Sequence, residues 1–157
     1  MYNKSLLSLA YRISHDTEIS KESTQETWIE VFHNLNKYKE NKGAFSSWVN
    51  TILVRRTWHI MNKKIKNQEL SEQVIHPPCS SDIVDKLSCE QLLQEMECIP
   101  TASRVVFKLY VIEGYKHKEI SELLNISASA SRSHLTKARK IMKHRYAIIN
   151  KITINEL

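Results

Sequence analysis

Residues 114–145 constrain the fold more than any other stretch, because their apolar residues recur at the spacing of two short helices separated by a tight turn. Ile120, Leu123 and Leu124 fall at positions i, i+3 and i+4, on one face of the first helix. Asn125 follows directly, and asparagine accepts the positive φ of a tight turn more readily than most residues do. The stretch therefore predicts a helix-turn-helix.

The second helix of this pair has an apolar side and a polar side. Ser127 is placed to cap it, since a serine hydroxyl accepts a hydrogen bond from an N–H of the first helical turn. Leu135, Ala138 and Met142 recur at i, i+3 and i+7 and should face the core. The opposite side should carry a set of polar residues: Ser129, Arg132, Ser133 and Thr136.

Positive charge accumulates on the same helix. No acid interrupts its basic residues, which are Arg132, Lys137, Arg139, Lys140, Lys143, Arg145 and Lys151. Such a surface carries a strong positive potential, and a phosphate backbone is its natural counterpart. The alternative is an ordinary amphipathic helix pair with a solvated basic face.

Composition favours an all-α fold. The 157 residues include only two glycines and three prolines, which leaves little turn chemistry for a β-rich chain. The net charge of +6 fits a polyanionic partner. No apolar run approaches membrane-spanning length and the N-terminus is too polar for a secretory signal, so a cytoplasmic protein is expected.

The chain shows no pattern of an enzyme or a metal site. It has no glycine-rich phosphate loop, no His-Glu-x-x-His and no nucleophile motif, so neither catalytic residues nor a cofactor are expected. Cys79, Cys89 and Cys98 are odd in number and lack the paired spacing of a zinc site, so reduced thiols are expected. His76 close to Cys79 is only a weak indication of metal binding.

The N-terminal part predicts two helices. A short first helix follows from the spacing of Leu6, Leu9 or Ala10, and Ile13. A second helix over about residues 20–35 has a predicted buried stripe of Thr24, Trp28, Val31 and Leu35, widened by Phe32. Three residues are left on its outer face: Gln25, Glu26 and Glu30.

A third helix is predicted to begin after Phe45, with Ser46 as its cap, and to run to about Lys66. Its inward residues are Val49, Ile52, Leu53 and Ile60, while another stripe holds Arg55, His59, Asn62 and Lys66, with Arg56 and Lys63 beside it. Trp58 lies within this basic stretch. Such a mixture suits stacking on unpaired bases while their phosphates are held, although basic helices are more often simply solvated.

An acidic stretch divides the chain into two helical units. Residues 69–98 hold seven acids against the single Lys86, and the first part of the stretch is rich in proline and serine. We therefore predict a first domain at residues 1–66, a linker at 67–82 and a second domain at 83–157. In the second domain a helix is expected at 83–96. Another should open at Pro100 and close at Gly114, with these residues in helical period: Ala102, Val105, Val106, Leu109 and Ile112.

Several short motifs carry a family resemblance. Residues 22–29 have the sequence Glu-Ser-Thr-Gln-Glu-Thr-Trp-Ile, and the third predicted helix opens with Phe45, Trp48, Val49 and Ile52. Residues 99–139 contain Ile-Pro, Tyr-Val-Ile-Glu-Gly-Tyr, His-Lys-Glu-Ile and Arg-Ser-His-Leu-x-x-Ala-Arg. Together these motifs resemble bacterial RNA polymerase sigma factors of the small extracytoplasmic-function group. The resemblance covers almost the whole chain.

This resemblance implies a function without covalent chemistry: binding core RNA polymerase through its β and β′ subunits, recognising promoter DNA and helping to melt it. Polymerase binding would fall to Glu22, Gln25, Glu26 and Glu30. Contact with the promoter −10 element would fall to Arg55, Arg56, His59, Asn62, Lys63 and Lys66. Contact with the −35 element would fall to Ser129, Arg132, Ser133, Thr136, Lys137, Arg139 and Lys140.

The chain also departs from the family pattern. Arg55 stands where the family usually has asparagine, His59 where it often has aspartate, and Ala128-Ser129-Ala130 where it usually has Glu-Gly-Thr. These changes predict more charge-driven and less sequence-driven DNA binding. Three explanations stay open: a compensated promoter preference, an unusual short promoter, or delivery by a partner such as an RNA-guided DNA-targeting protein. An anti-sigma factor is a further candidate partner.

A stand-alone helix-turn-helix regulator is the alternative function. Repressors of that class normally pair about a two-fold axis to reach adequate affinity for their sites. The chain has no heptad seam that would form such a dimer.

Overall fold

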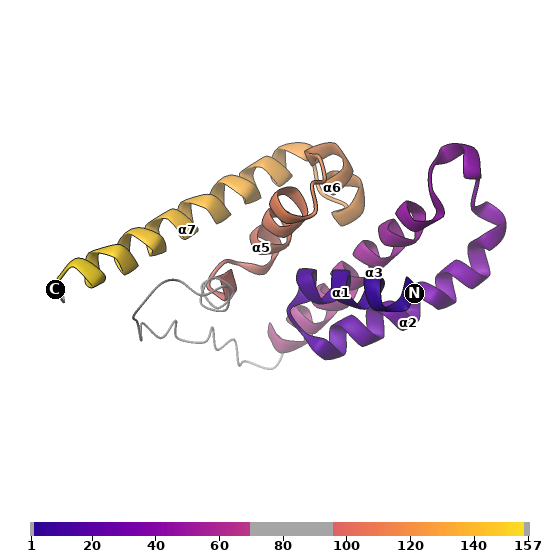
Figure 1. Cartoon of the computed structure of the whole chain (residues 1–157), viewed down its shortest axis with the longest axis horizontal. Helices are drawn as coiled ribbons and strands as arrows, with labels where there is room; N and C mark the ends of the chain where they lie inside the picture. Colours follow the sequence, from indigo (N-terminus) through magenta and orange to yellow (C-terminus); the bar gives the residue numbers. More distant parts are fainter. Residues whose placement is uncertain (1, 70–95, 156–157) are drawn as a thin grey trace. The chain divides into compact units, whose positions relative to one another are not determined.

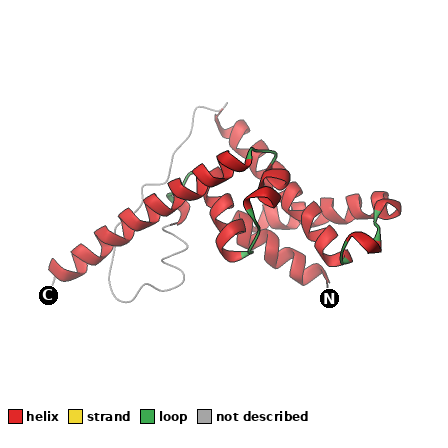
Figure 2. Ribbon diagram, turned by 90° about the horizontal axis from the view of Figure 1, so that it is seen from above, coloured by secondary structure: helices red, strands yellow, loops and turns green. Residues whose placement is uncertain are grey.

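The computed structural model describes residues 2–69 and 96–155 (Figure 1). The chain divides into two compact units, Met1–Val74 and Ile75–Leu157. The described elements are α1 (Tyr2–Ser14), α2 (Thr17–Asn34), η1 (Leu35–Lys37), η2 (Glu40–Lys42), α3 (Phe45–Glu69), α5 (Thr101–Phe107), η3 (Lys108–Ile112), α6 (His117–Leu124) and α7 (Ala128–Asn155). Within these residues the predicted all-α fold is confirmed, and no strand occurs among them (Figure 2).

Parts of the predicted organisation fall outside the description. α3 runs to Glu69, through the first three residues of the predicted linker at 67–82. The rest of that linker and nearly all of the predicted helix at 83–96 lie outside the described residues, as do His76, Cys79 and Cys89. Cys98 is disulfide-bonded, so the expectation of a reduced thiol is wrong at this position.

The first unit is a three-helix arrangement in which α1, α2 and α3 each pack on the other two. Its core combines Leu6, Leu9, Ala10 and Ile13 of α1 with Ile19 and Val31 of α2 and Val49, Ile52, Leu53, Val54, Ile60 and Met61 of α3. The predicted inward residues of α1 and α3 are therefore confirmed. Burying an aliphatic side chain of this size contributes about 1.5–3 kcal/mol, so this shared core holds the helices together.

The buried face of α2 consists largely of hydroxyl residues: Ser20, Ser23, Thr24 and Thr27. Thr24 Oγ1 donates to the carbonyl oxygen of Ser20 at 2.7 Å, and Thr27 Oγ1 to that of Ser23 at 2.6 Å. Such bonds within the helix satisfy the hydroxyls, so these small side chains can be buried at a close helix contact. The predicted stripe is wrong at Phe32 and Leu35, which are 80% and 54% exposed.

Capping fixes where α2 and α3 begin. Asp16 caps α2, since its Oδ1 accepts from the N–H of Glu18 at 2.9 Å and of Ile19 at 3.1 Å. In α3 the first-turn N–H groups of Ser47 and Trp48 donate to the carbonyl oxygen of Ala44. Because α3 begins at Phe45, the predicted Ser46 cap is wrong, and Ser46 lies exposed inside the first turn.

In the second unit α5 begins after Pro100, as predicted, and continues into the π-helical turn η3. Gly114 ends this segment with a φ of 77°, which a glycine adopts without strain. Val105, Val106 and Leu109 are buried as expected, but Ile112 is 50% exposed. A π turn holds more residues than an α turn and shifts every later side chain around the axis, so the prediction for Ile112 is wrong.

The helix-turn-helix of α6 and α7 is confirmed. Asn125 ends α6 in the left-handed conformation, with φ 54° and ψ 48°. Ser127 Oγ accepts from the N–H of Ala130 at 3.0 Å, the predicted cap of α7. The predicted inward residues Ile120, Leu123, Leu124, Leu135 and Ala138 are buried, and Met142 packs partly buried against a cluster of Met96, Ile99 and Ala138.

Candidate nucleic-acid interface

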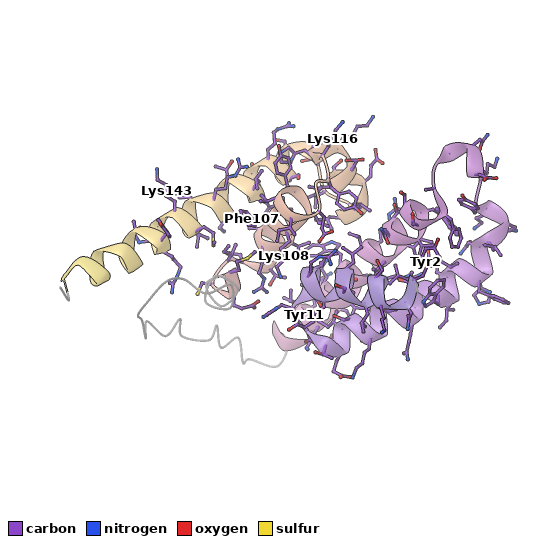
Figure 3. All side chains as sticks on the ribbon, in the orientation of Figure 1. Tyr2, Tyr11, Phe107, Lys108, Lys116 and Lys143 are labelled. Carbon is purple, nitrogen blue, oxygen red and sulfur yellow. The ribbon has the colours of Figure 1, made fainter. Side chains whose placement is uncertain are left out.

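One face of α7 presents all seven side chains that the sequence predicts for −35 DNA: Ser129, Arg132, Ser133, Thr136, Lys137, Arg139 and Lys140 are exposed. Ser131, Leu135 and Ala138 are buried on the other side of the same helix. Lys143 extends the exposed basic face along α7, where its side chain projects from the ribbon (Figure 3). Polar groups are thus available along several turns of one helix, the geometry that a major groove accepts.

Two histidine–serine hydrogen bonds tie α7 to its neighbours. His134 Nδ1 lies 3.0 Å from Ser103 Oγ of α5, and His117 Nδ1 of α6 lies 2.9 Å from Ser131 Oγ. The two α7 residues involved, Ser131 and His134, lie on the side of the helix that packs against the rest of the unit. They fix the rotation of the helix about its axis, and therefore which residues face outward.

Among the basic residues predicted to contact DNA, Arg139 has a guanidinium that also contacts an aromatic ring within the unit. It lies over the ring of Tyr110, 5.8 Å from the centroid, within the range of a cation–π interaction. Tyr110 stacks in turn on His117, with ring centroids 4.5 Å apart. Arg139 therefore joins α7 to η3 and α6 as well as contributing positive charge.

The second unit also contains a buried lysine, in η3. Lys108 is 2% exposed, and burial together with the charge of Arg104 lowers the pKa of its ammonium group to about 8. Glu97, which forms an ion pair with Arg104, partly opposes that shift. The sequence predicts no buried charge at Lys108, because a lysine side chain is almost never fully buried.

The predicted −10 residues of α3 fall into two groups. Arg55, His59, Lys63 and Lys66 are exposed and Asn62 is half-buried, so these residues form one accessible basic stripe. Arg56 points instead to α2. Its Nε donates to Glu30 Oε2 at 2.5 Å, and its Nη1 lies 3.5 Å from Glu26 Oε2.

The predicted polymerase-binding residues of α2 divide in the same way. Glu22 and Gln25 are exposed, whereas Glu26 and Glu30 are half-buried beside Arg56, so the expectation that both lie on the outer face is wrong. The outer face instead carries three exposed apolar residues: Ile29, Phe32 and Leu35, at 59%, 80% and 54% exposure. The sequence predicts Phe32 and Leu35 for the buried stripe and makes no prediction for the burial of Ile29.

Comparison with known protein families identifies both units. A model of sigma-70 region 2 matches residues 1–63, and a model of sigma-70 region 4 matches residues 89–142. The chain belongs to the extracytoplasmic-function sigma factors. All seven side chains on the exposed face of α7 lie inside the region 4 match, and α7 of this sigma factor continues beyond it to Asn155.

Individual relatives agree with this assignment. The sigma factor is 24% identical over 142 residues to the ECF RNA polymerase sigma factor SigE of Mycolicibacterium smegmatis, covering 86% of this chain but only 54% of that relative. It is 25% identical over 143 residues to SigK of Mycobacterium tuberculosis, covering 87% of this chain and 76% of SigK. It therefore spans about half the length of the first relative and about three quarters of the second.

A solved structure shares the fold. The sigma factor RpoE of Bartonella quintana, determined in complex with the anti-sigma factor NepR, superposes with a TM-score of 0.65 at 14% identity, over 91% of this chain and 90% of that one. Among the described residues of this sigma factor, no group of three His, Cys, Asp or Glu side chains could hold a metal ion. None of the helices searched in that part of the chain is long and apolar enough to cross a membrane.

Proposed function

We propose that this sigma factor binds core RNA polymerase through the β and β′ subunits, directs it to promoters and helps to melt the DNA. The observation that carries the proposal is the presence of two basic helix faces, on α3 and α7, in units that match sigma-70 regions 2 and 4. Recognition and melting need binding energy and no covalent step. The exposed stripe of α3 would contact the opened −10 strand, and α7 would enter the major groove at −35.

The outer face of α2 is the proposed polymerase contact. Ile29 and Phe32 of α2 and Leu35 at the start of η1 are exposed apolar residues, and Glu22 and Gln25 are exposed polar residues of α2. Interfaces commonly combine an apolar centre containing aromatic residues with a polar rim. We therefore place Phe32 at the centre of the contact, with Glu22 and Gln25 at its edge.

Replacing Phe32 tests this placement. Because the side chain is 80% exposed, Phe32→Ser should leave folding intact, yet it should weaken core-polymerase binding by about 1–3 kcal/mol if the ring is buried in the complex. The measurement is an equilibrium titration of labelled sigma factor with core polymerase. Leu7→Ser on α1, where the side chain is 38% exposed, is the matched control and should bind as the wild type does.

The titration also separates the two classes of function. If the wild-type chain shows no affinity for core polymerase yet binds duplex DNA alone, it is a stand-alone regulator and the sigma-factor proposal fails. If the wild type binds and Phe32→Ser binds equally well, only the placement on α2 fails.

A further inference from the structure

Arg56 joins two helices that the proposed function assigns to different partners. The guanidinium leaves α3 and lies between two carboxylates one turn apart on α2, with Nε bonded to Glu30 at 2.5 Å and Nη1 3.5 Å from Glu26. The three side chains retain 30–39% of their exposure, so they lie at the edge of the helix contact. The contact links residues 26 positions apart in the chain.

This environment is unsuited to a DNA phosphate. Two carboxylates surround one guanidinium, so the local charge is negative and a phosphate approaching Arg56 would be repelled. Arg55, the next residue, is exposed on the basic stripe of α3. Neighbouring arginines of one helix thus have different surroundings, and of the two only Arg55 lies on the exposed basic stripe.

The carboxylates depend on Arg56 for their position. Glu26 Oε2 is buried and accepts no hydrogen bond within the described part of the chain, so the nearby guanidinium charge is what compensates its lost hydration. Glu26 and Glu30 are also like charges at i and i+4, which repel each other on a helix. Without Arg56 both side chains would turn outward and lose their fixed orientation.

We infer that Arg56 is a positioning residue for the polymerase contact: it holds Glu26 and Glu30 in place on α2 and makes no direct contact with DNA. The inference rests on the proposed function, in which α2 faces core polymerase. Because the ion pairs are partly exposed, they contribute little to folding stability, so the effect appears in binding.

A double-mutant cycle on the full chain tests the inference. Arg56→Ala should weaken core-polymerase binding roughly three- to tenfold, because Glu26 and Glu30, which border the outer face of α2, are then mobile and must be ordered when the complex forms. Adding Arg56→Ala to Glu30→Gln should cost less than Arg56→Ala costs alone, since the two residues act as a pair. Arg56→Lys, which keeps the charge but not the planar fork, should retain part of the affinity.

A second measurement excludes a DNA role. Binding to a mixed-sequence single-stranded oligonucleotide is followed against salt concentration for Arg56→Ala and for Arg55→Ala. Losing one phosphate contact lowers the slope of log K against log salt by about 0.7, and this is expected for Arg55→Ala only. Thermal melting by circular dichroism shows whether each variant is folded.

The outcomes are distinct. Weaker core binding with an unchanged salt slope supports the inference. A flatter slope for Arg56→Ala with unaltered core affinity makes Arg56 a phosphate contact and overturns it, as does a lower melting temperature with unaltered affinity, which makes the pair merely structural. If wild-type protein binds no core polymerase, the proposed function fails as well, whereas failure of Arg56→Ala alone leaves it standing.

Discussion

At the scale of single residues, the exposed side chains of α7 differ in how far the unit itself holds them. Arg139 rests on Tyr110, and Thr136 Oγ1 donates to the carbonyl oxygen of Arg132 at 3.0 Å. The side chains of Arg132 and Lys140 are exposed one and three turns after the cap. An arginine near the start of a recognition helix is placed to meet base edges, whereas a lysine farther along meets the backbone.

Substitutions at these two positions should therefore have different effects. Arg132→Ala should relax sequence preference at one or two base pairs, at a cost of roughly 1–3 kcal/mol, because a base contact is lost. Lys140→Ala should weaken all duplexes alike and flatten the salt dependence. Binding to a randomised duplex library measures both. A uniform loss across the library for Arg132→Ala would show that Arg132 is only a phosphate clamp.

The lowered pKa of the buried Lys108 predicts how the stability of the chain changes with pH. Below pH 8 the lysine is charged in the folded and unfolded states, and its burial costs stability in full. Between about pH 8 and its ordinary value of 10.5 the unfolded state binds a proton that the folded state does not, so stability rises with pH. Lys108→Met should therefore stabilise the chain by about 1–3 kcal/mol at pH 7 and remove this rise. Urea unfolding at several pH values measures it, and equal stability of both proteins at pH 7 would contradict it.

At the scale of elements, local chemistry predicted some helices well and missed contacts made between helices. The turn between α6 and α7 followed from Asn125 and Ser127, because a left-handed residue and a cap act within a few positions of the chain. The face of α2 could not be found in this way. Its buried side consists largely of serine and threonine residues whose hydroxyls donate to carbonyl oxygens of the same helix. Apolar periodicity does not detect such a face, and it wrongly predicted that Phe32 and Leu35 are buried.

The candidate interface shows the same difference between features set by local sequence and features set by contacts between helices. All seven residues of α7 that the sequence assigns to −35 DNA are exposed, since amphipathic spacing decides which residues of that helix face outward. The orientation of Arg56 was not predicted, because its hydrogen-bond partner Glu30 lies 26 residues earlier on another helix. Lys108 was missed for a different reason: it lies three residues after Val105 on the buried side of the segment, where a lysine is not ordinarily expected.

The α6–α7 turn can be tested with a matched pair of variants. Asn125 has a φ of 54°, which alanine adopts at a cost of roughly 1 kcal/mol or more and glycine adopts without strain. Asn125→Ala should therefore lower the free energy of unfolding by about 1 kcal/mol, while Asn125→Gly should change it little. Denaturant unfolding measures the difference, and equal values for the two variants would mean that the turn tolerates another conformation.

At the scale of the whole molecule, two basic faces lie on separate units of one chain. Linking two weak DNA contacts raises overall affinity through effective concentration, provided that both can engage at once. Each face can then be individually weak while the holoenzyme is selective. What each face contributes to selection depends on its base contacts, because phosphate contacts carry no sequence information directly.

Both faces depart from the family pattern at positions that the resemblance assigns to DNA contact. Arg55 is exposed where sigma factors of this group usually have asparagine, and an amide both donates to and accepts from a base edge, whereas arginine only donates and is attracted to any phosphate or to guanine. Ala128 and Ala130 supply no polar side-chain groups at the start of α7. Specific binding normally exceeds non-specific binding by about 4–10 kcal/mol, so the loss of two good base contacts would leave weak selection among genomic sites.

We therefore expect this sigma factor, with core polymerase alone, to start transcription weakly and with little sequence preference on a randomised-promoter library. The physical reason is that its remaining contacts are mostly charge-driven and act on every sequence alike. Sequencing the transcripts and their templates measures the preference.

Adding extract from the source cells should sharpen the motif if a DNA-targeting partner, such as an RNA-guided protein, delivers the holoenzyme. Arg55→Asn, which restores the family's amide, should strengthen selection at −10 without extract. A strong two-box motif from the wild-type chain and core polymerase alone would show that other residues compensate, and that no partner is needed to choose the site.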